Sequence, residues 1–164
     1  TLVATGDLSL TAGGAVTQSG AWVVPATTTI NAGANAITLT NAANNFTGAV
    51  VDGYEADSHV EALASKPFYA ACRERLTPGG MLVVNLWGGD KLFQTLLGRI
   101  RRSFSDAVLV VDDGTLSNSI VFACKGHALA QYRPGAVRRP KGLDADAADQ
   151  LLAAFARVSA ALKN

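Results

Sequence analysis

The first fifty residues of the chain are almost without charge. Asp7 is the one acidic residue among them, and all 14 Lys and Arg residues come later in the sequence. Ala, Thr, Gly and Asn together make up 32 of these fifty residues. This composition argues against a helical, solvated domain here, and the abrupt change near Val50 indicates that two kinds of sequence meet at that point.

Several other features that define protein classes are also scarce. The formal net charge is only +1. The chain therefore lacks the excess of basic residues that is typical of nucleic-acid-binding proteins, and we expect no nucleic-acid partner. Apolar runs are too short to cross a membrane, and we expect no membrane partner. The chain begins at Thr1 without a basic stretch followed by an apolar one, so we expect no signal peptide and interpret the chain as an internal fragment or a processed product.

Cysteine and histidine are too few to form a disulfide framework or a metal centre. Cys72 fits an apolar helical pattern and Cys124 an apolar strand pattern, so we predict two buried thiols of a reducing compartment. His59 and His127 lack any paired ligand spacing, and no metal site is predicted. These features favour a cytoplasmic location for the later part of the chain.

Residues 1–49 predict a β-rich segment of short strands. Alternating apolar and small polar residues occur at Leu8–Thr11, Thr27–Ile30 and Ile37–Thr40, with Gly and Asn at the corners between them. The pattern of Leu8–Thr11 recurs at Ile37–Thr40, which suggests an internal repeat. Short strands, little charge and an approximate repeat are typical of a β-solenoid.

The stretch AITLTNAANNFTGAV, residues 36–50, resembles the repeats of filamentous haemagglutinin-like and autotransporter-type surface proteins. That resemblance implies a passive stalk or scaffold of a secreted surface protein, without catalytic residues. About two coils are too few to bury a solenoid core alone, because each coil needs a neighbour on both sides. The alternative is a poorly ordered leader with a tendency to form strands.

From Val50 onward the sequence predicts an α/β fold that forms part of a doubly wound, Rossmann-like sheet. The expected elements are a strand ending at Val51, helices near 59–76 and 90–103, strands at 81–87, 107–112 and 118–125, and a last helix capped by Asp144 or Asp146. The continuous apolar run Met81–Trp87 predicts a central strand covered on both faces. Residues 118–124 are expected to run antiparallel to the other strands. We assign residues 50–127 to this domain and 128–164 to its final loop and helix.

Two stretches of this part carry a family resemblance. They are VDGYEADSHVEALASKPFYAACRERLTPGGMLVVNLW, residues 51–87, and NSIVFACKG, residues 118–126. Together they resemble the C-terminal half of spermidine-synthase-like aminopropyltransferases over roughly residues 50–127. The resemblance implies the fold of class I S-adenosylmethionine-dependent methyltransferases. It also implies aminopropyl transfer from decarboxylated S-adenosylmethionine, the co-substrate of intact relatives, to a small-molecule amine.

In that family two acidic residues three apart follow the fourth strand, and Asp52 and Glu55 match these positions. An amine substrate is an ammonium at neutral pH and must lose a proton before it can attack, so a carboxylate within hydrogen-bond distance can act as general base. Asp52 and Glu55 are therefore the predicted catalytic residues, with Tyr54 between them in substrate binding. Glu55 stands where the family usually has Asp. The alternative is that Asp52 and Glu55 lie in a turn and cap the helix that follows.

Asn85 and Trp87 are predicted to bind substrate. Both lie toward the carboxyl end of the central strand, the edge at which such sheets bind ligands. Trp87 is expected to form an apolar wall of the site. Packing of Trp87 in the core beneath the helix of residues 90–103 is the alternative.

The cofactor-binding half of such a fold is not recognisable in the sequence. Gly13-Gly14 is followed by another strand pattern where a helix should begin, and no acidic residue ends a second strand. We therefore assign no cofactor-binding residue, expect no cofactor to be bound, and expect the chain to be inactive alone. Without its usual neighbour the strand ending at Val51 has an open edge, which the leader or a second chain could pair with. A homodimer through this edge is one expectation.

Three functions are consistent with these observations. The first is a fragment derived from an aminopropyltransferase, based on Asp52, Glu55 and the family resemblance. The second is a structural or surface β-solenoid protein that carries an α/β cap. The third is an artificial fusion without a selected function, based on the abrupt change of composition.

Overall fold

A computed structural model describes residues 1–33, 35, 37–51, 61–112, 118–131, 138–139 and 141–163 of the chain. The strands are β1 (Leu2–Val3), β2 (Leu8–Thr11), β3 (Val16–Thr17), β4 (Trp22–Asn31), β5 (Ile37–Thr38), β6 (Asn45–Val51), β7 (Leu76–Trp87), β8 (Val108–Asp112) and β9 (Asn118–Cys124). The helices are α1 (Glu61–Ala64), α2 (Lys66–Arg75), α3 (Phe93–Ser103), α4 (Ala128–Gln131) and α5 (Ala145–Ala161).

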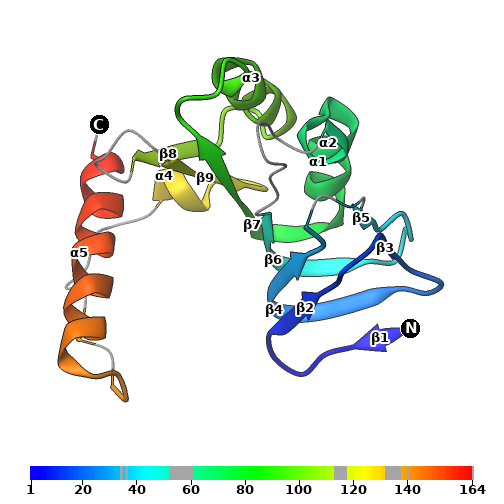
Figure 1. The fold of residues 1–164 in the computed structure, drawn as a ribbon, viewed down its shortest axis with the longest axis horizontal. Coiled ribbons are helices and arrows are strands. Elements are labelled where there is room, and N and C mark those ends of the chain that lie inside the picture. The colour runs from blue at the N-terminus through cyan, green and yellow to red at the C-terminus, as the bar shows by residue number, and fades with distance from the viewer. Residues whose placement is uncertain are drawn as a thin grey trace.

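One continuous sheet joins the two kinds of sequence (Figure 1). Its strand order is β1-β4-β6-β7-β9-β8, and β2 also pairs with β4. Strands β6 and β7 are parallel, whereas β9 is antiparallel to both β7 and β8. This confirms the predicted α/β fold with a mixed, Rossmann-like sheet, the central position of the run Met81–Trp87 and the antiparallel strand 118–124.

The first 44 residues, which we call the solenoid segment, wind as parallel coils. Leu8 pairs with Thr28 after an advance of 20 residues, and Thr28 pairs with Ala49 after an advance of 21. On a second, smaller sheet, Val16 pairs with Ile37, again 21 residues on. Successive coils therefore stack as parallel strands on two sheets, with one register shift between Val24 and Thr27, and this is the arrangement of a β-solenoid.

The structure corrects the internal repeat suggested by the sequence. Leu8–Thr11 does not stack on Ile37–Thr40; its partner is Thr28–Asn31. Each coil contains strands of both sheets, and these strands share the same alternation of apolar and polar residues. The internal repeat suggested by the sequence therefore matched a strand of one sheet with a strand of the other.

A pair of side-chain amides, from the half-buried Gln18 and the buried Asn44, holds the corner of the solenoid segment. The side chains of Gln18 and Asn44 exchange two hydrogen bonds, of 2.9 and 2.7 Å. The Asn44 Oδ1 atom also accepts a bond from the Trp22 backbone N–H at 2.8 Å. Asn44 is buried, and these bonds provide the partners that a buried amide requires. The pair ties the first coil to the start of β6.

The edge of β6 is paired within the chain. Thr28, Thr29 and Ile30 of β4 lie beside Ala49, Val50 and Val51 of β6 in a parallel ladder. This confirms the prediction that the leader contributes a strand to this edge. It also removes the reason for a homodimer through the same edge, because the backbone groups that a second chain would use are already bonded.

The main core lies between β7 and the helices α2 and α3, which pack against each other on one face of the sheet (Figure 1). Leu82, Val84 and Leu86 of β7 point into this core and are fully buried or nearly so. Met81 and Val83, which alternation directs to the opposite face, are only half-buried. The second face of the strand is therefore only partly covered.

The boundaries of α2 have clear local causes. Ser65 is the N-cap, and its hydroxyl accepts the Phe68 N–H at 3.2 Å, while Pro67 occupies the first turn. At the other end the Lys125 ammonium donates to the carbonyls of Glu74 and Leu76 at 2.9 and 2.6 Å. A cation at a helix C-terminus satisfies carbonyls that have no partner within the helix.

Helix α5 packs against β8 at the far end of the sheet from the solenoid segment (Figure 1). Asp144 is its N-cap, accepting the Ala147 N–H at 2.8 Å, which decides between the two predicted capping residues. Leu151 and Phe155 on this helix are exposed. None of the helices in the described ranges is long and apolar enough to cross a membrane.

Removal of residues 1–44 should expose the β6 edge and cause aggregation. The variant keeps β6 but loses β4, so a row of backbone N–H and C=O groups beside an apolar sheet would face solvent. Size-exclusion chromatography with light scattering should show large species. A soluble monomer with an unchanged melting temperature would contradict the role assigned to β4.

The stability of the fold should decrease above about pH 9. Burial raises the pKa of the Cys72 thiol from 9.0 to about 12, and burial, together with the nearby Cys72, also raises the pKa of Tyr69. An unfolded chain releases these protons at lower pH than the folded chain. The contribution of the two groups to the free energy of unfolding is therefore fully present below about pH 9 and is lost as the pH rises. The loss is about 1.4 kcal/mol per pH unit for each group.

Urea unfolding at about pH 8 and about pH 10.5 would measure this decrease. The Cys72→Ala variant is the matched comparison, because its unfolding free energy should lack the part of the decline that begins near the pKa of a free thiol. Identical slopes in the two proteins would show that the thiol does not retain its proton on folding.

Candidate functional site

The carboxyl ends of β6 and β7 define the candidate site. Val51 pairs with Val84 in the parallel ladder, so Asn85 is the next residue of β7 beyond the last pair. In the sequence, Asp52 directly follows Val51. Asp52, Tyr54 and Glu55, three of the five predicted site residues, lie outside the described residues. The described part of the site consists of Asn85, Trp87 and their surroundings.

Asn85 and Trp87 come from the same face of β7. They are two residues apart on the strand, so alternation places them on the face that also carries Val83, away from α2 and α3. Asn85 is half-buried and pairs with Ile120 of β9. The structure therefore brings together the two substrate-binding residues that were predicted on this strand, at the predicted end of it.

Trp87 is exposed, with 44% of its surface accessible to solvent. The chain turns immediately after it, and the Asp90 N–H donates to the Trp87 carbonyl at 3.1 Å. A side chain at Gly89 would lie 2.9 Å from the indole ring, so the ring rests directly over this turn. The alternative interpretation, in which Trp87 packs in the core beneath the following helix, is wrong.

The helix after this turn begins later than residue 90. Its first residue is Phe93 and its N-cap is Leu92, whose N–H donates to the Asp90 Oδ1 atom at 2.7 Å. Asp90 therefore stabilises the turn between Trp87 and the helix.

Sequence reasoning missed a polar pair at the same edge of the sheet. The Ser119 hydroxyl donates to the Asp112 carboxylate at 2.6 Å. Asp112 ends β8, and Ser119 lies opposite Leu86 of β7. Ser119 is buried, so this bond satisfies a hydroxyl that would otherwise lack a partner in the core. The sequence did contain a signal for this pair. Ser119 interrupts an apolar strand pattern, and the preceding strand ends in Asp112.

The residues in the place of a cofactor-binding unit do not suit an adenosyl group. In the sheet β4 occupies the position beside β6, and only residues 32–36 separate it from β5. A Gly-rich turn that leads into a helix N-terminus, the usual grip on such a group, does not fit into five residues. Among the described residues no group of three His, Cys, Asp or Glu side chains could hold a metal ion.

Comparison with protein families divides the chain at the same place as its composition. Residues 1–52 match a family model described as repeats of unknown function (DUF5649). The match agrees with the repeating coils of the solenoid segment and assigns them no activity. The resemblance of this segment to filamentous haemagglutinin-like proteins stays a prediction.

Part of the chain is homologous to aminopropyltransferases. A stretch of 74 residues, 45% of the chain, is 34% identical to the polyamine aminopropyltransferases of Neisseria meningitidis serogroup A and Chromobacterium violaceum. The chain spans only 28% of the length of these relatives. A probable spermidine synthase from Corynebacterium glutamicum superposes with a TM-score of 0.47 and 12% identity, over 88% of this chain and 62% of that one.

Replacement of Gly89 by Ala should displace the Trp87 ring. The added methyl group would lie 2.9 Å from two ring atoms, closer than side-chain contacts allow. The near-ultraviolet circular dichroism and the fluorescence of the protein should change, while far-ultraviolet spectra stay the same. Gly14→Ala is the control, because a side chain there meets nothing within 4 Å. Equal spectra for both variants would contradict the described position of the indole ring.

Proposed function

We propose that residues 50–127 are the amine-binding half of a spermidine-synthase-like transferase, held in place by the solenoid segment. The observation that supports the proposal is the parallel register of β6 and β7, in which Val51 pairs with Val84, so that Asn85 follows this last pair on β7 and Asp52 follows Val51 in the sequence. The sequence similarity to polyamine aminopropyltransferases supports the same assignment.

The proposed chemistry is recognition of a polyamine cation. Asp52 and Glu55 supply negative charge to hold an ammonium group, and one of the two carboxylates accepts the proton that the amine must lose before attack. Trp87 offers an exposed aromatic ring, which attracts cations and covers the methylene chain between two amines. Asn85 contributes a side-chain amide that orients the substrate from the same face of β7.

In this proposal the isolated chain binds an amine but does not transfer an aminopropyl group. The strand next to β6 is β4 of the solenoid segment, whose turn into β5 offers no helix N-terminus to an adenosyl co-substrate. The solenoid segment then has a structural role, in which it replaces the pairing partner of β6 and keeps the end of that strand in position.

The second candidate function is a structural repeat protein with an α/β cap. The match of residues 1–52 to a repeat family and the parallel coils favour it. In that case the end of β7 has no ligand, and amine binding is absent or unaffected by changes in Asp52 and Glu55.

Calorimetric titration distinguishes the two functions. We expect saturable binding of spermidine to the full chain, weakened about tenfold or more by Asp52→Asn because one charge-assisted bond is lost. Asp7→Asn removes an equal charge from the solenoid segment and should leave the affinity unchanged. Equal affinities of the two variants, or no binding by the parent chain, would favour the structural function.

The same titration with decarboxylated S-adenosylmethionine and methylthioadenosine tests the missing half of the site. We expect dissociation constants of about 1 mM or weaker, which corresponds to no more than about 4 kcal/mol of binding free energy. Mass spectrometry should detect no aminopropylated product. Micromolar binding of either compound would contradict the proposal, and any turnover should then decrease about 10²–10⁴-fold in Asp52→Asn.

A further inference from the structure

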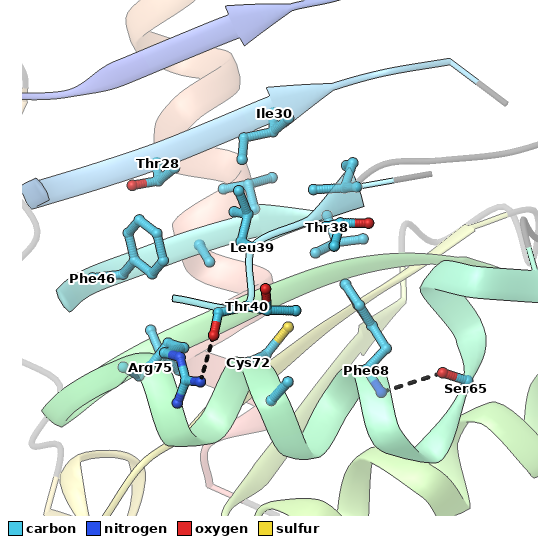
Figure 2. A pocket seen from close by; sticks show the side chains of 16 residues that line it. Thr28, Ile30, Thr38, Leu39, Thr40, Phe46, Ser65, Phe68, Cys72 and Arg75 are labelled. Carbon is cyan, nitrogen blue, oxygen red and sulfur yellow. Dashed lines mark hydrogen bonds between the residues drawn. The ribbon is translucent and has the colours of Figure 1, made fainter. Parts of the chain in front are cut away.

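A cavity of about 300 Å³ lies between the solenoid segment and α2 (Figure 2). Strands β4, β5 and β6 form one side of it and the helix forms the other. In a longer solenoid the next strand would cover β5 at a spacing of about 4.8 Å, whereas a helix, about 10 Å across, cannot follow a strand edge so closely. The cavity therefore results from covering a coil with a helix.

Most of the cavity wall is apolar. Ile30, Leu39 and Phe46 contribute from the solenoid segment and β6, and Phe68 and Cys72 contribute from α2 (Figure 2). Enclosed cavities of about 150 Å³ with similar walls bind benzene, and the space here is partly open to solvent, which gives a ligand a way in. A space of about twice that volume suits a molecule of about two fused rings.

Two wall residues, Thr28 and Arg75, carry a buried polar atom that has no hydrogen-bond partner among the described residues. Thr28 is only 3% exposed, and its Oγ1 atom has no hydrogen-bond partner among the described residues. It lies two residues before Ile30 on β4, so both side chains point to the same face of the strand, toward the cavity. A buried hydroxyl without a partner is costly, and a ligand that bonds to it recovers that cost.

The charged residue at the cavity is partly engaged. Arg75 donates one guanidinium N–H to the Thr40 carbonyl at 3.2 Å, which joins α2 to the solenoid segment, and another to the carboxylate of its neighbour Glu74 at 3.4 Å. The Arg75 Nε–H has no partner among the described residues. A hydroxyl or carbonyl oxygen of an uncharged ligand can accept a hydrogen bond from this N–H or from the Thr28 hydroxyl.

We propose that this cavity is a binding site for a small neutral molecule of about two fused rings that carries a single hydroxyl or carbonyl group. The polar group bonds to the Thr28 hydroxyl, and the rings pack between Phe46 and Phe68. The site lies on the helix-covered face of the sheet, whereas Asn85 and Trp87 lie on the other face, so the inference does not rest on these two residues or on the proposed function.

Titration of the full chain with 2-naphthol, followed by calorimetry, tests this proposal. We expect saturable binding with one molecule per chain. Thr28→Val keeps the shape of the side chain and removes its hydroxyl, so it should weaken binding about tenfold. Thr29→Val is the matched control, because Thr29 is the exposed neighbour that points away from the cavity, and its affinity should equal that of the parent.

A second variant tests the location of the ligand. Ala49 lines the cavity from β6, and Ala49→Leu should fill part of the space and abolish binding, with the far-ultraviolet spectrum unchanged. Absence of saturable binding to the parent, equal affinities of Thr28→Val and Thr29→Val, or unchanged affinity of a folded Ala49→Leu would each overturn the proposal. If Ala49→Leu does not fold, the Thr28 and Thr29 variants decide.

Discussion

The parallel ladder between β4 and β6 is the interaction on which the rest of the structure depends. It is the point at which an uncharged, Thr-rich strand bonds to the first strand of an ordinary α/β sheet, with Thr28 beside Ala49 and Ile30 beside Val51. Backbone pairing does not depend on side-chain identity, so two unrelated sequences can share one ladder. The position of β7, and with it Asn85 and Trp87, follows from this pairing.

The sequence predicted the parts of the fold that depend on local patterns. The run Met81–Trp87 became the central strand, and Asp144, one of the two predicted capping residues, capped α5, because apolar periodicity and capping act over a few residues. The turn at Gly89 that exposes Trp87 and the stacking of Leu8 on Thr28 were not predicted. Both depend on contacts between segments, which alternation alone does not encode.

The same limit explains why the sequence indicated one candidate site and missed the other. Asp52 and Glu55 were found because their spacing matches a family, a signal that needs no knowledge of packing. The cavity beside Thr28 arises only when a helix covers a coil, and no residue type marks that event in the sequence. Thr28 itself reads as one of three consecutive threonines in an ordinary strand.

The coil advance of 20 to 22 residues sets the unit in which the solenoid segment can change length. Addition of one whole coil would widen the sheet by one strand, loss of one would narrow it, and either change would leave the face of every later residue unchanged. The coils already differ in length by one or two residues, which the corners between strands absorb. A single-residue insertion inside β6 would instead invert the faces of the strand residues that follow it. Variation in this part of the chain should therefore occur in whole coils or at the corners, and not inside β6.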